Sequence, residues 1–385
     1  MLSGTNVALG VTGSIAAVKV VELAHELRRH GATVKGVMSE SARGIVHPWA
    51  IEFATGDDVY TELTGATEHV ELFGSDGWAD VYLIAPATAN TIGKMAAAVD
   101  DTPVTTCATT ALGSGIPIAI APAMHRPMYD HPGVLEAIER LEDWDVRFVD
   151  PRFEEGKAKL ADLDTIVLDT ARAAGPTPLD GTRIVVTSGA TSEPIDPVRV
   201  LSNRASGKTG RAIARGLYAR GADVTLVHDG PEVPYADVKR VQTAAEMREA
   251  VLSSIETADA FVSAAAISDF TIDPTEEKIR SGQDLTLHFE PTPKLIDAVR
   301  NAAANLPIVG FKLESGDEAS MIDEARALHD GYDLAFVVAN QESVMGEDGT
   351  SVRFVDGDTV TAFEGTKEVL GLRVADELAD RLDRA

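Results

Sequence analysis

Cysteine is almost absent from this sequence, since Cys107 is the single one among 385 residues. A lone cysteine excludes an intrachain disulfide framework and a cysteine-rich zinc site. Long apolar runs are also missing, because none approaches the roughly 20 residues that a membrane-spanning helix requires. The N-terminus lacks the charged region and apolar stretch of a secretory signal. We therefore expect a cytoplasmic protein that has no membrane partner.

Basic residues are scarce, because 34 Lys and Arg stand against 61 Asp and Glu, for a formal net charge of −27. Such a surface repels nucleic acids and anionic membranes, so we expect neither as a partner. The acidic residues are spread along the chain and Arg outnumbers Lys about two to one, which indicates adaptation to high salt. A mildly acidic protein from a low-salt organism is the alternative. In either case a phosphate site must carry its own local donors.

Apolar strands alternate with amphipathic helices along the first half of the chain. The pattern predicts a strand at 6–11, a helix at 14–31 and a strand at 32–39, then strands at 79–87 and 116–124. Near-continuous apolar strands are typical of parallel sheets that are covered on both faces. We therefore predict an α/β fold with two doubly wound domains, the first flavodoxin-like or Rossmann-like and the second Rossmann-like.

A segment rich in proline and glycine at 171–181 interrupts this alternation. We predict a linker at 173–181 between domains at 1–172 and 182–385. The alternation then restarts with these expected elements: strands at 182–189, 222–230, 258–268, 306–314 and 333–340, a helix at 210–221, a hairpin at 351–363 around Asp356 and Gly357, and a C-terminal helix.

Each half places a glycine-containing loop between its first strand and its first helix. The loops are "GVTGSIAAVK" at 10–19 and "TSGATSEPIDPVRVLSNRASGKTG" at 187–210. Backbone N–H groups at a helix N-terminus bind anions, and glycine lets a phosphate approach. Neither loop has the GxGxxG pattern and downstream acid of a dinucleotide site. This argues against the strongest rival from another enzyme class, a two-domain nicotinamide-dependent oxidoreductase.

Further motifs carry a family resemblance over nearly the whole chain. "TEHVELF" at 67–73, "APATANTIGKMAAAVDD" at 85–101 and "TTCATTALGSGIPIAIAPAMHRPMY" at 105–129 resemble flavin-dependent decarboxylases of phosphopantothenoylcysteine. The second half resembles phosphopantothenate–cysteine ligase. Together the halves resemble the bifunctional coenzyme A biosynthesis family in its archaeal form. A flavin carrier or a flavin prenyltransferase would leave the second half unexplained.

For the first half, the resemblance implies FMN as the cofactor. In this family the flavin oxidises the cysteinyl thiol to a thioaldehyde, which accepts electrons as CO₂ leaves, and the flavin then reduces the product. For Cys107, a small buried hydrophobe is favoured over a nucleophile. The residues implied to contact FMN are Gly13, Ser14, Ile15, Ser39, Thr105, Thr106, Cys107 and Ala108.

The resemblance also implies catalytic residues for decarboxylation. His69 matches the family's active-site histidine, although a capping or surface histidine is the structural alternative. His125 stands in "PAMHRPM" where the family carries an asparagine that binds the substrate carboxylate, and a histidine can donate a similar hydrogen bond. The family's flap cysteine has no counterpart at 151–162. Lys157, Lys159 or water would then supply the proton, and the sequence leaves these open.

For the second half, the resemblance implies a ligase that joins 4'-phosphopantothenate to cysteine. CTP or another nucleoside triphosphate activates the carboxylate as an acyl-nucleotide, and Mg²⁺ accompanies the triphosphate. Asn203 would stabilise the oxyanion formed when the amine attacks, although an ordinary turn residue is the alternative. Lys278 would neutralise charge on the phosphates. The sequence contains no dedicated carboxylate cage for the metal.

The resemblance assigns a larger set of residues to the nucleotide. Asp269 would contact the base from the carboxyl end of a strand, Phe311 would stack near the base, and Arg326 would replace one of two family lysines. The full set is Ala264, Ala265, Ala266, Asp269, Lys278, Thr292, Pro293, Lys294, Leu295, Phe311 and Arg326. We also expect a homo-oligomer, with a trimer-based decarboxylase assembly and dimeric ligase contacts.

Overall fold

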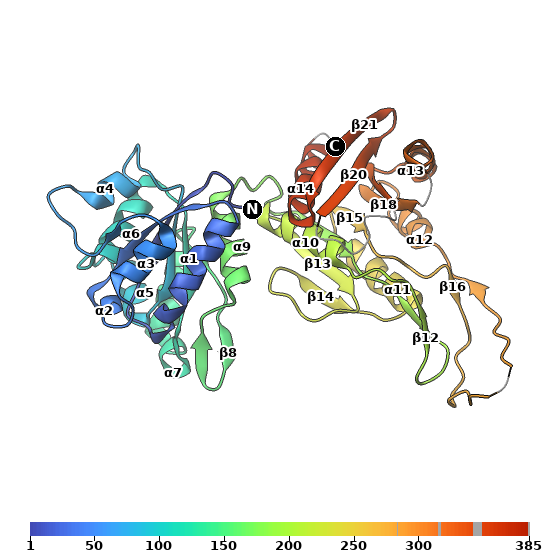
Figure 1. The fold of residues 1–385 in the computed structure, drawn as a ribbon, viewed down its shortest axis with the longest axis horizontal. Helices are drawn as coiled ribbons and strands as arrows, with labels where there is room; N and C mark the ends of the chain where they lie inside the picture. Colours follow the sequence, from blue (N-terminus) through green and yellow to red (C-terminus); the bar gives the residue numbers. More distant parts are fainter. Residues whose placement is uncertain (283, 315–316, 342–348, 384–385) are drawn as a thin grey trace. The chain divides into compact units, whose positions relative to one another are not determined.

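The chain folds into two compact units, Met1–Gly175 and Pro176–Ala385, each built around one open sheet (Figure 1). This computed structural model describes residues 1–282, 284–314, 317–341 and 349–383. Among these residues, no helix combines the length and the apolar character needed to cross a membrane. The two units are described separately below.

The first unit contains a six-stranded parallel sheet in the order β3-β2-β1-β4-β5-β7. The order reverses between β1 and β4, so the loops that follow these two strands meet at the carboxyl edge of the sheet, where open α/β sheets bind ligands. The strands are β1 (Asn6–Val11), β2 (Thr33–Met38), β3 (Val59–Tyr60), β4 (Val81–Ala87), β5 (Ile118–Pro122) and β7 (Arg147–Phe148).

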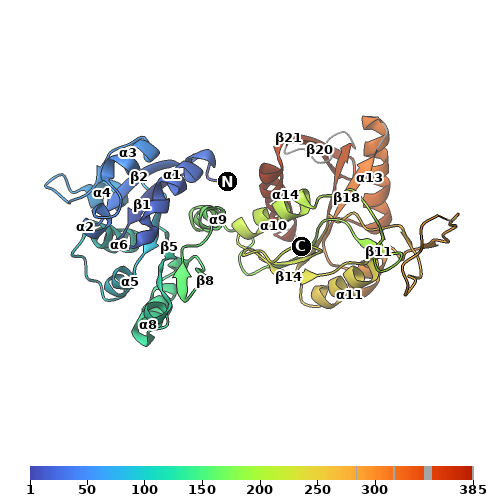
Figure 2. The same cartoon turned by 60° about the horizontal axis from the view of Figure 1, so that its bottom comes forward.

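Helices cover both faces of this sheet, which explains why its central strands are apolar throughout. Figure 2 shows α1 (Val20–Arg29) and α3 (Pro48–Thr55) on one face. α9 (Leu163–Ala174) packs into the same apolar cluster. The opposite cluster receives α4 (Glu68–Phe73), α5 (Ala89–Ala96), α6 (Pro103–Ser114) and α8 (Pro132–Glu142).

Short elements lie at the edges of the first unit. Ile15–Lys19 forms a 3-10 turn before α1, and α2 (Glu40–Arg43) and α7 (Arg126–Tyr129) are single-turn helices. A hairpin of β8 (Arg152–Glu154) and β9 (Lys157–Lys159) pairs with β6 (Met124–His125).

The second unit contains an eight-stranded sheet in the order β14-β13-β10-β15-β18-β19-β20-β21. Pairing is parallel as far as β19 and antiparallel for the last two strands. This order also reverses at its first strand, between β10 and β15. The strands are β10 (Arg183–Thr187), β13 (Asp223–His228), β14 (Asp237–Arg240), β15 (Ala260–Ser263), β18 (Ile308–Glu314), β19 (Phe336–Gln341), β20 (Gly349–Asp356) and β21 (Thr359–Thr366).

Two glycines allow the closest helix crossing of the second unit, between α10 (Lys208–Ala219) and α14 (Lys367–Leu382). A Cβ added at Gly371 would lie 2.1 Å from the Ala212 carbonyl oxygen, and one added at Gly216 would lie 2.3 Å from the Gly371 backbone. The other helices are α11 (Ala244–Ile255), α12 (Leu295–Ala302) and α13 (Glu318–Tyr332), which pack into one apolar cluster.

Two pairs of short strands project from the second unit. β11 (Ser192–Pro194) pairs with β12 (Val200–Ser202), and β16 (Phe270–Thr271) pairs with β17 (Glu290–Pro291). We call residues 192–202, 270–282 and 284–291 the arm, which extends away from the main sheet (Figure 1).

The two-domain α/β fold predicted from the sequence is confirmed, and so is the hairpin around Gly357. Most predicted boundaries shift by no more than three residues. Three differences concern the sites and the linker. The predicted strand at 258–268 ends at Ser263, because the following residues turn to line a cavity. The predicted helix at 14–31 begins as a 3-10 turn. α9 continues to Ala174, two residues into the predicted linker, and Gly175 follows as its cap.

Candidate functional sites

Thr12 joins two strand ends at the reversal point of the first sheet. Its Oγ1 donates to the carbonyl of Pro86 (2.7 Å), near the end of β4, and accepts from the Thr88 N–H (3.2 Å), just after it. Ser14 Oγ donates to the Ala123 carbonyl (2.9 Å) after β5. These bonds fix the loop after β1 against its two neighbours, so this edge of the sheet presents a fixed arrangement of backbone and hydroxyl groups.

Three of the residues predicted to hold FMN lie together at this edge. A Cβ at Gly13 would lie 2.4 Å from Ser41 Oγ, so glycine lets the loop pass close to the start of α2. Ser39 caps α2, and its Oγ lies 3.1 Å from Ser41 Oγ. Ser14 caps the 3-10 turn, where the side chain of Ile15 is 78% exposed. The edge therefore offers hydroxyl donors next to a close backbone approach, as a phosphate group requires.

Four residues of α6 were predicted to contact FMN. Thr106 is partly exposed, and the other three are buried. Thr106 Oγ1 donates to the Asp100 carbonyl (2.8 Å). Thr105 is buried and closes a capping box with Thr102. Cys107 and Ala108 lie within the hydrophobic cluster, where burial, followed by the charge of Glu68, raises the pKa of the Cys107 thiol to about 12. Cys107 is therefore a core residue and not a thiolate nucleophile.

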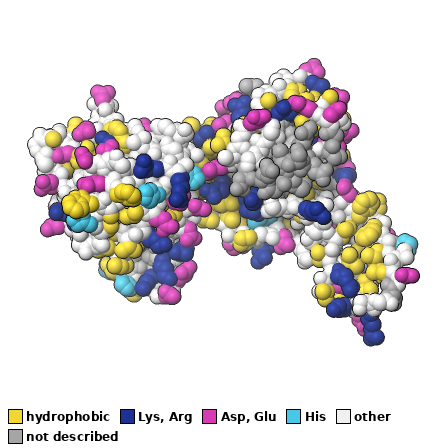
Figure 3. All heavy atoms as spheres, viewed as in Figure 1, with side chains coloured by type: hydrophobic (Ala, Val, Ile, Leu, Met, Phe, Trp, Pro, Cys, Tyr) yellow, Lys and Arg dark blue, Asp and Glu magenta, His cyan; other side chains and the backbone are white. Residues whose placement is uncertain are grey.

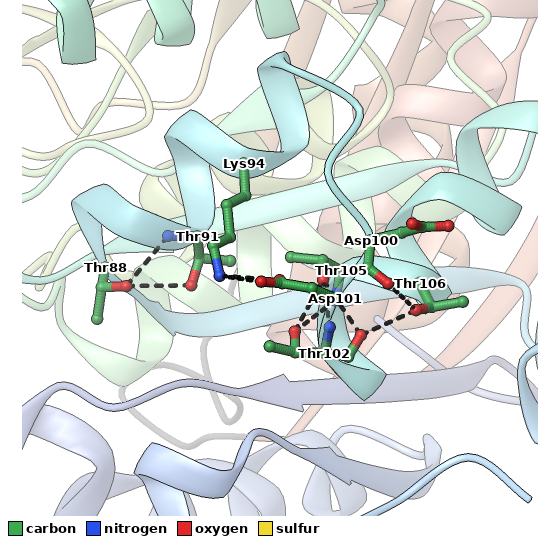
Figure 4. Close-up of polar contacts among 8 residues, drawn as sticks. All are labelled: Thr88, Thr91, Lys94, Asp100, Asp101, Thr102, Thr105 and Thr106. Atoms are coloured by element: carbon green, nitrogen blue, oxygen red, sulfur yellow. Dashed lines mark hydrogen bonds and ion pairs between the residues drawn. The ribbon is translucent and has the colours of Figure 1, made fainter.

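A cavity of about 510 Å³ opens beside this part of α6. Figure 4 shows how the segment before α6 is held: Lys94 Nζ of α5 lies 2.8 and 2.7 Å from the two carboxylate oxygens of Asp101. The sequence analysis missed this ion pair, although both residues lie in the recognised stretch at 85–101. The cavity is lined by Glu40, Arg43, Thr61, Glu62, Leu63, Asp100, Asp101, Thr102, Pro103 and Thr106.

His69 lies in the first turn of α4, and its Nδ1 is buried with no hydrogen-bond partner among the described residues. The turn before it is fixed by Glu68, whose carboxylate accepts from the Thr64 N–H (2.8 Å) and from the Thr64 hydroxyl. The Thr64 side-chain bond is the main reason that the pKa of Glu68 lies below its ordinary value. An unpaired buried nitrogen on a fixed turn is a favourable place for a ligand contact.

The predicted flap forms the β8–β9 hairpin, and it lies against the segment that carries His125. His125 pairs with Lys157, and Met124 pairs with Ala158. Lys159 points to other partners, because its Nζ lies 3.0 Å from Glu154 and 2.9 Å from Glu155. The structure thus brings together two of the residues predicted for decarboxylation, the exposed His125 and Lys157.

The main cavity of the second unit, about 410 Å³, lies at the carboxyl edge of the sheet where the strand order reverses. Its walls include Gly189, Asp269, Phe311 and residues 205–210 at the start of α10. Thr187 Oγ1 accepts from the Ala264 and Ala265 N–H groups (3.2 and 3.3 Å). Because the resemblance assigns nucleotide contacts to several of these residues, we call this space the nucleotide cavity.

A smaller cavity of about 270 Å³ shares Ala265, Ile267, Asp269, Phe311 and Lys312 with the nucleotide cavity. Lys294 Nζ lies 2.6 Å from Asp269 Oδ1, so two predicted nucleotide contacts form an ion pair. The predicted residues Thr292, Pro293, Lys294 and Leu295 complete this wall.

Comparison with known proteins agrees with the two-site geometry. A family model described as Flavoprotein matches residues 1–174, and the DNA/pantothenate metabolism flavoprotein C-terminal domain matches residues 179–382. The coenzyme A biosynthesis bifunctional protein CoaBC of Thermococcus kodakarensis is 47% identical over 389 residues, which cover 99% of this chain and 96% of the relative. The chain belongs to the CoaBC family.

Two further matches have lower identity. The CoaBC protein of Methanocaldococcus jannaschii is 34% identical, covering 98% of this chain and 94% of the relative. The solved structure of an FMN-dependent cysteine decarboxylase, SpaF, is 31% identical with a TM-score of 0.40, covering 46% of this chain and 100% of its own. The family resemblance predicted from the sequence is confirmed, so the chain is a flavoprotein and a bifunctional enzyme of coenzyme A biosynthesis.

Among the predicted ligase residues of this CoaBC chain, Asn203 is bonded to the loop that follows β15. Its Nδ2 donates to the Ala266 carbonyl (3.1 Å), and Ala266 N–H donates to the Gly189 carbonyl (2.8 Å). The first loop of the unit, the loop after β15 and Asn203 are therefore linked beside the nucleotide cavity.

Lys278 and Arg326 are the two predicted nucleotide contacts outside these cavities. Lys278 is exposed on the arm, and its neighbour Ile279 is tied to Asp196, whose carboxylate accepts from the Ile279 N–H (3.1 Å). Arg326 Nε donates to the Gly357 carbonyl (3.4 Å) at the turn between β20 and β21. The structure therefore does not bring either side chain to the nucleotide cavity.

The sequence analysis missed several residues that line the ligase cavities. Lys312 lines two of them, and its Nζ lies 3.3 Å from Glu324. Arg211 and His228 line a third cavity, and no motif drew attention to them. The sequence contains one signal that could have identified Arg211. A basic residue directly after Gly210 is notable in so acidic a chain.

Proposed function

We propose that the second unit joins 4'-phosphopantothenate to cysteine with CTP, through an acyl-nucleotide. We further propose that the first unit converts the product to 4'-phosphopantetheine with FMN. The observation that carries this proposal is that each family domain has its own site at the reversal point of its own sheet. Two separate sites on one chain fit two successive reactions better than one composite site.

In the ligase reaction, the nucleotide cavity divides into a base region and a phosphate region. Asp269 and Phe311 line the base region with the backbone of residues 264–266. The triphosphate would lie across the N-terminus of α10, where backbone N–H groups and Gly207, at φ +70°, allow close approach. Pyrophosphate then leaves as the carboxylate of 4'-phosphopantothenate attacks the α-phosphate.

Asn203 would act in the second step, when the amine of cysteine attacks the acyl-nucleotide. Its amide has two N–H donors, and one is bound to the Ala266 carbonyl. The other can therefore donate to the oxyanion without reorganisation of the side chain. For Lys278 to neutralise phosphate charge, its segment of the arm must close over the cavity or be supplied by a second copy of the chain.

FMN fits the first unit in the chemistry of the groups present. Ser14, Ser39 and Ser41 place hydroxyl groups beside the Gly13 backbone, where a phosphate can be held. Bound FMN would supply the oxidation and re-reduction that let the substrate carboxylate leave. His69 would hydrogen-bond the reacting group through its unpaired Nδ1.

Two residues of the paired strands β6 and β9 would carry out the remaining steps of decarboxylation. His125 would donate to the substrate carboxylate and hold it until CO₂ leaves. Lys157, opposite His125, would deliver the proton to the product. Lys159 is a weaker acid for this task, because its bonds to Glu155 and Glu154 raise its pKa.

Exposed apolar side chains support the proposed homo-oligomer. On the arm, Val198, Val200, Phe270, Leu285 and Phe289 are each at least 41% exposed, and Figure 3 shows apolar side chains along it. Isolated exposed apolar residues are ordinary, but a row of them on a projecting arm is typical of an interface. We assign the arm to dimeric ligase contacts, and Trp49 and Phe53 of the first unit to a trimeric assembly.

The metal is proposed to arrive with the nucleotide. Within the described parts of the chain, no cluster of three or more His, Cys, Asp or Glu could hold an ion. Mg²⁺ would therefore be held mainly by phosphate oxygens, as Mg²⁺ commonly is at sites that keep several waters.

The test is a complete reaction with purified protein, 4'-phosphopantothenate and cysteine, run separately with CTP, ATP, GTP and UTP. We expect pyrophosphate release and 4'-phosphopantetheine formation, fastest with CTP. Failure of every nucleotide to release pyrophosphate would refute the ligase proposal. Preference for another nucleotide would refute only the assignment of CTP.

A further inference from the structure

A third cavity of the ligase unit, about 240 Å³, adjoins the nucleotide cavity and shares Gly189, Ala205 and Ser206 with it. Asn203, Arg211 and His228 also line it. We call it the adjoining cavity. The proposed reaction gives Arg211 and His228 no task, although one is a cation and the other a titratable group.

His228 has an unpaired ring nitrogen in this cavity. Its side chain is 1% exposed, and Nε2 is buried without a hydrogen-bond partner among the described residues. The backbone of Pro231 acts to raise the pKa of the His228 ring, against the larger effect of burial. An unpaired buried nitrogen carries an energetic cost that a suitable ligand would remove.

One cation and one carboxylate, Arg211 and Asp229, line the same cavity. Arg211 Nη2 donates to the Ser206 carbonyl (3.1 Å), which holds the guanidinium beside the N-terminal loop of the 12-residue helix α10. Burial and the charge of Arg211 lower the pKa of His228, while Asp229 and Glu232 act in the opposite direction. Arg211 offsets the charge of Asp229 and the N-terminus of α10 adds the positive end of a helix dipole, so the cavity suits an anion in a chain of net charge −27.

We propose that Arg211 and His228 form a subsite for the terminal phosphates of the nucleotide, which leave as pyrophosphate. This inference rests on the proposed ligase function and adds a binding task to it. Asn203 lines the adjoining cavity, so the reacting carboxyl group lies near the junction of the two cavities. Pyrophosphate is directly attached to the reacting phosphorus, whereas the phosphate of 4'-phosphopantothenate lies at the far end of a long molecule.

The size of the adjoining cavity also favours pyrophosphate. Its volume of about 240 Å³ is below the range of about 300–1,000 Å³ that is usual for sites enclosing drug-sized ligands. A cavity of this size suits a small anion such as pyrophosphate. When the anion binds, its charge raises the pKa of His228. Nε2 then takes a proton from solvent and donates to a phosphate oxygen.

The test is calorimetric titration of the full chain with inorganic pyrophosphate, in two buffers of different ionisation heat. Arg211→Gln and His228→Gln should each weaken pyrophosphate binding by about tenfold or more, because loss of one hydrogen bond to a charged group usually lowers affinity by that factor. His228→Gln should also lower the proton uptake that accompanies binding. Arg240→Gln is the matched control, because Arg240 lies opposite His228 on β14 and is exposed. It should bind pyrophosphate as the unaltered chain does.

Titrations with CMP and with 4'-phosphopantothenate separate the two sources of phosphate, and both affinities should stay unchanged. Unchanged pyrophosphate affinity in both variants would overturn the inference. A loss confined to 4'-phosphopantothenate would overturn it too, by assigning the cavity to the substrate. If His228→Gln fails to fold, Arg211→Gln decides. Pyrophosphate release by the unaltered chain, measured separately, shows whether the ligase function itself holds.

Discussion

His125 and Lys157 pair directly across the β6–β9 ladder, although 31 residues separate them in the chain. One was identified as a carboxylate donor and the other as one of two alternative proton donors. Their pairing distinguishes Lys157 from Lys159, which is bound to Glu154 and Glu155.

Lys157→Gln should therefore slow decarboxylation of phosphopantothenoylcysteine by about 10²-fold, the lower end of what a general acid contributes. Lys159→Gln should change the rate only a few-fold, because its ammonium group is held by two carboxylates and its pKa is raised. The measurement is CO₂ release under saturating substrate. Equal losses in the two variants would show that the hairpin matters only as a whole, and no loss in either would assign the proton to water.

His69→Asn should abolish decarboxylation and leave ligation intact, since the two sites belong to separate compact units. Retained FMN absorbance and an unchanged thermal midpoint would show that the variant is folded. The readouts are 4'-phosphopantetheine formation from phosphopantothenoylcysteine, and pyrophosphate release from CTP. A parallel loss of both reactions in a folded variant would contradict the assignment of separate sites.

Gly371→Ala should destabilise the second unit by about 1–3 kcal/mol, as overpacking does. The added Cβ would meet the Ala212 carbonyl oxygen at 2.1 Å, and this clash outweighs the gain in helix propensity of about 1 kcal/mol. Gly331→Ala in α13 is the matched control, because a Cβ there would have no neighbour within 4 Å. Denaturant unfolding measures both. Equal midpoints for the two variants would show that α10 and α14 separate at little cost.

Salt should stabilise the protein, because 61 acidic side chains face only 34 basic ones. The Debye length falls from about 10 Å at 0.1 M to about 3 Å at 1 M, so repulsion between exposed carboxylates weakens as KCl is added. We expect the thermal midpoint to rise steadily from about 0.1 M to about 3 M KCl. A thermal midpoint that stays unchanged over that range would contradict the interpretation of the surface as salt-adapted.

The central strands of both sheets could be predicted because their residues are apolar on both faces, whereas the edge strands β3, β7 and β14 were not predicted, since they are short or polar. The two loops could be predicted because glycine and hydroxyl residues follow the first strand of each half. The ion pair of Lys94 with Asp101 and the pairing of His125 with Lys157 could not, since each depends on how the chain returns in space. His228 was missed for the same reason. A single histidine at a strand end carries no sequence signal until the cavity beside it is known.

Cys107 lies in the core, as the interpretation of it as a small buried hydrophobe predicts. Lys278 shows a further limit. Lys278 matches a ligase motif, but the arm that carries it lies outside the cavities described here. A motif identifies a residue type at a chain position, whereas its task depends on packing and on assembly.

The central claim is that the ligase unit forms an acyl-nucleotide that Asn203 helps to consume. Asn203→Ala should still release pyrophosphate from CTP, but the attack of cysteine should slow by about 10²–10³-fold, the usual cost of losing one oxyanion donor. Lys278→Gln should instead release little pyrophosphate, because its charge is needed before the intermediate exists.

The most direct measurement is mass spectrometry of the Asn203→Ala reaction, quenched after 4'-phosphopantothenate and CTP have been mixed with the enzyme and cysteine. The account predicts a peak for the cytidylyl ester of 4'-phosphopantothenate that accumulates in this variant and not in Lys278→Gln. Both variants should keep the thermal midpoint of the unaltered chain. Absence of that ester, with both variants unfolding early, would mean that the loop at 187–210 is a structural turn and would contradict the account.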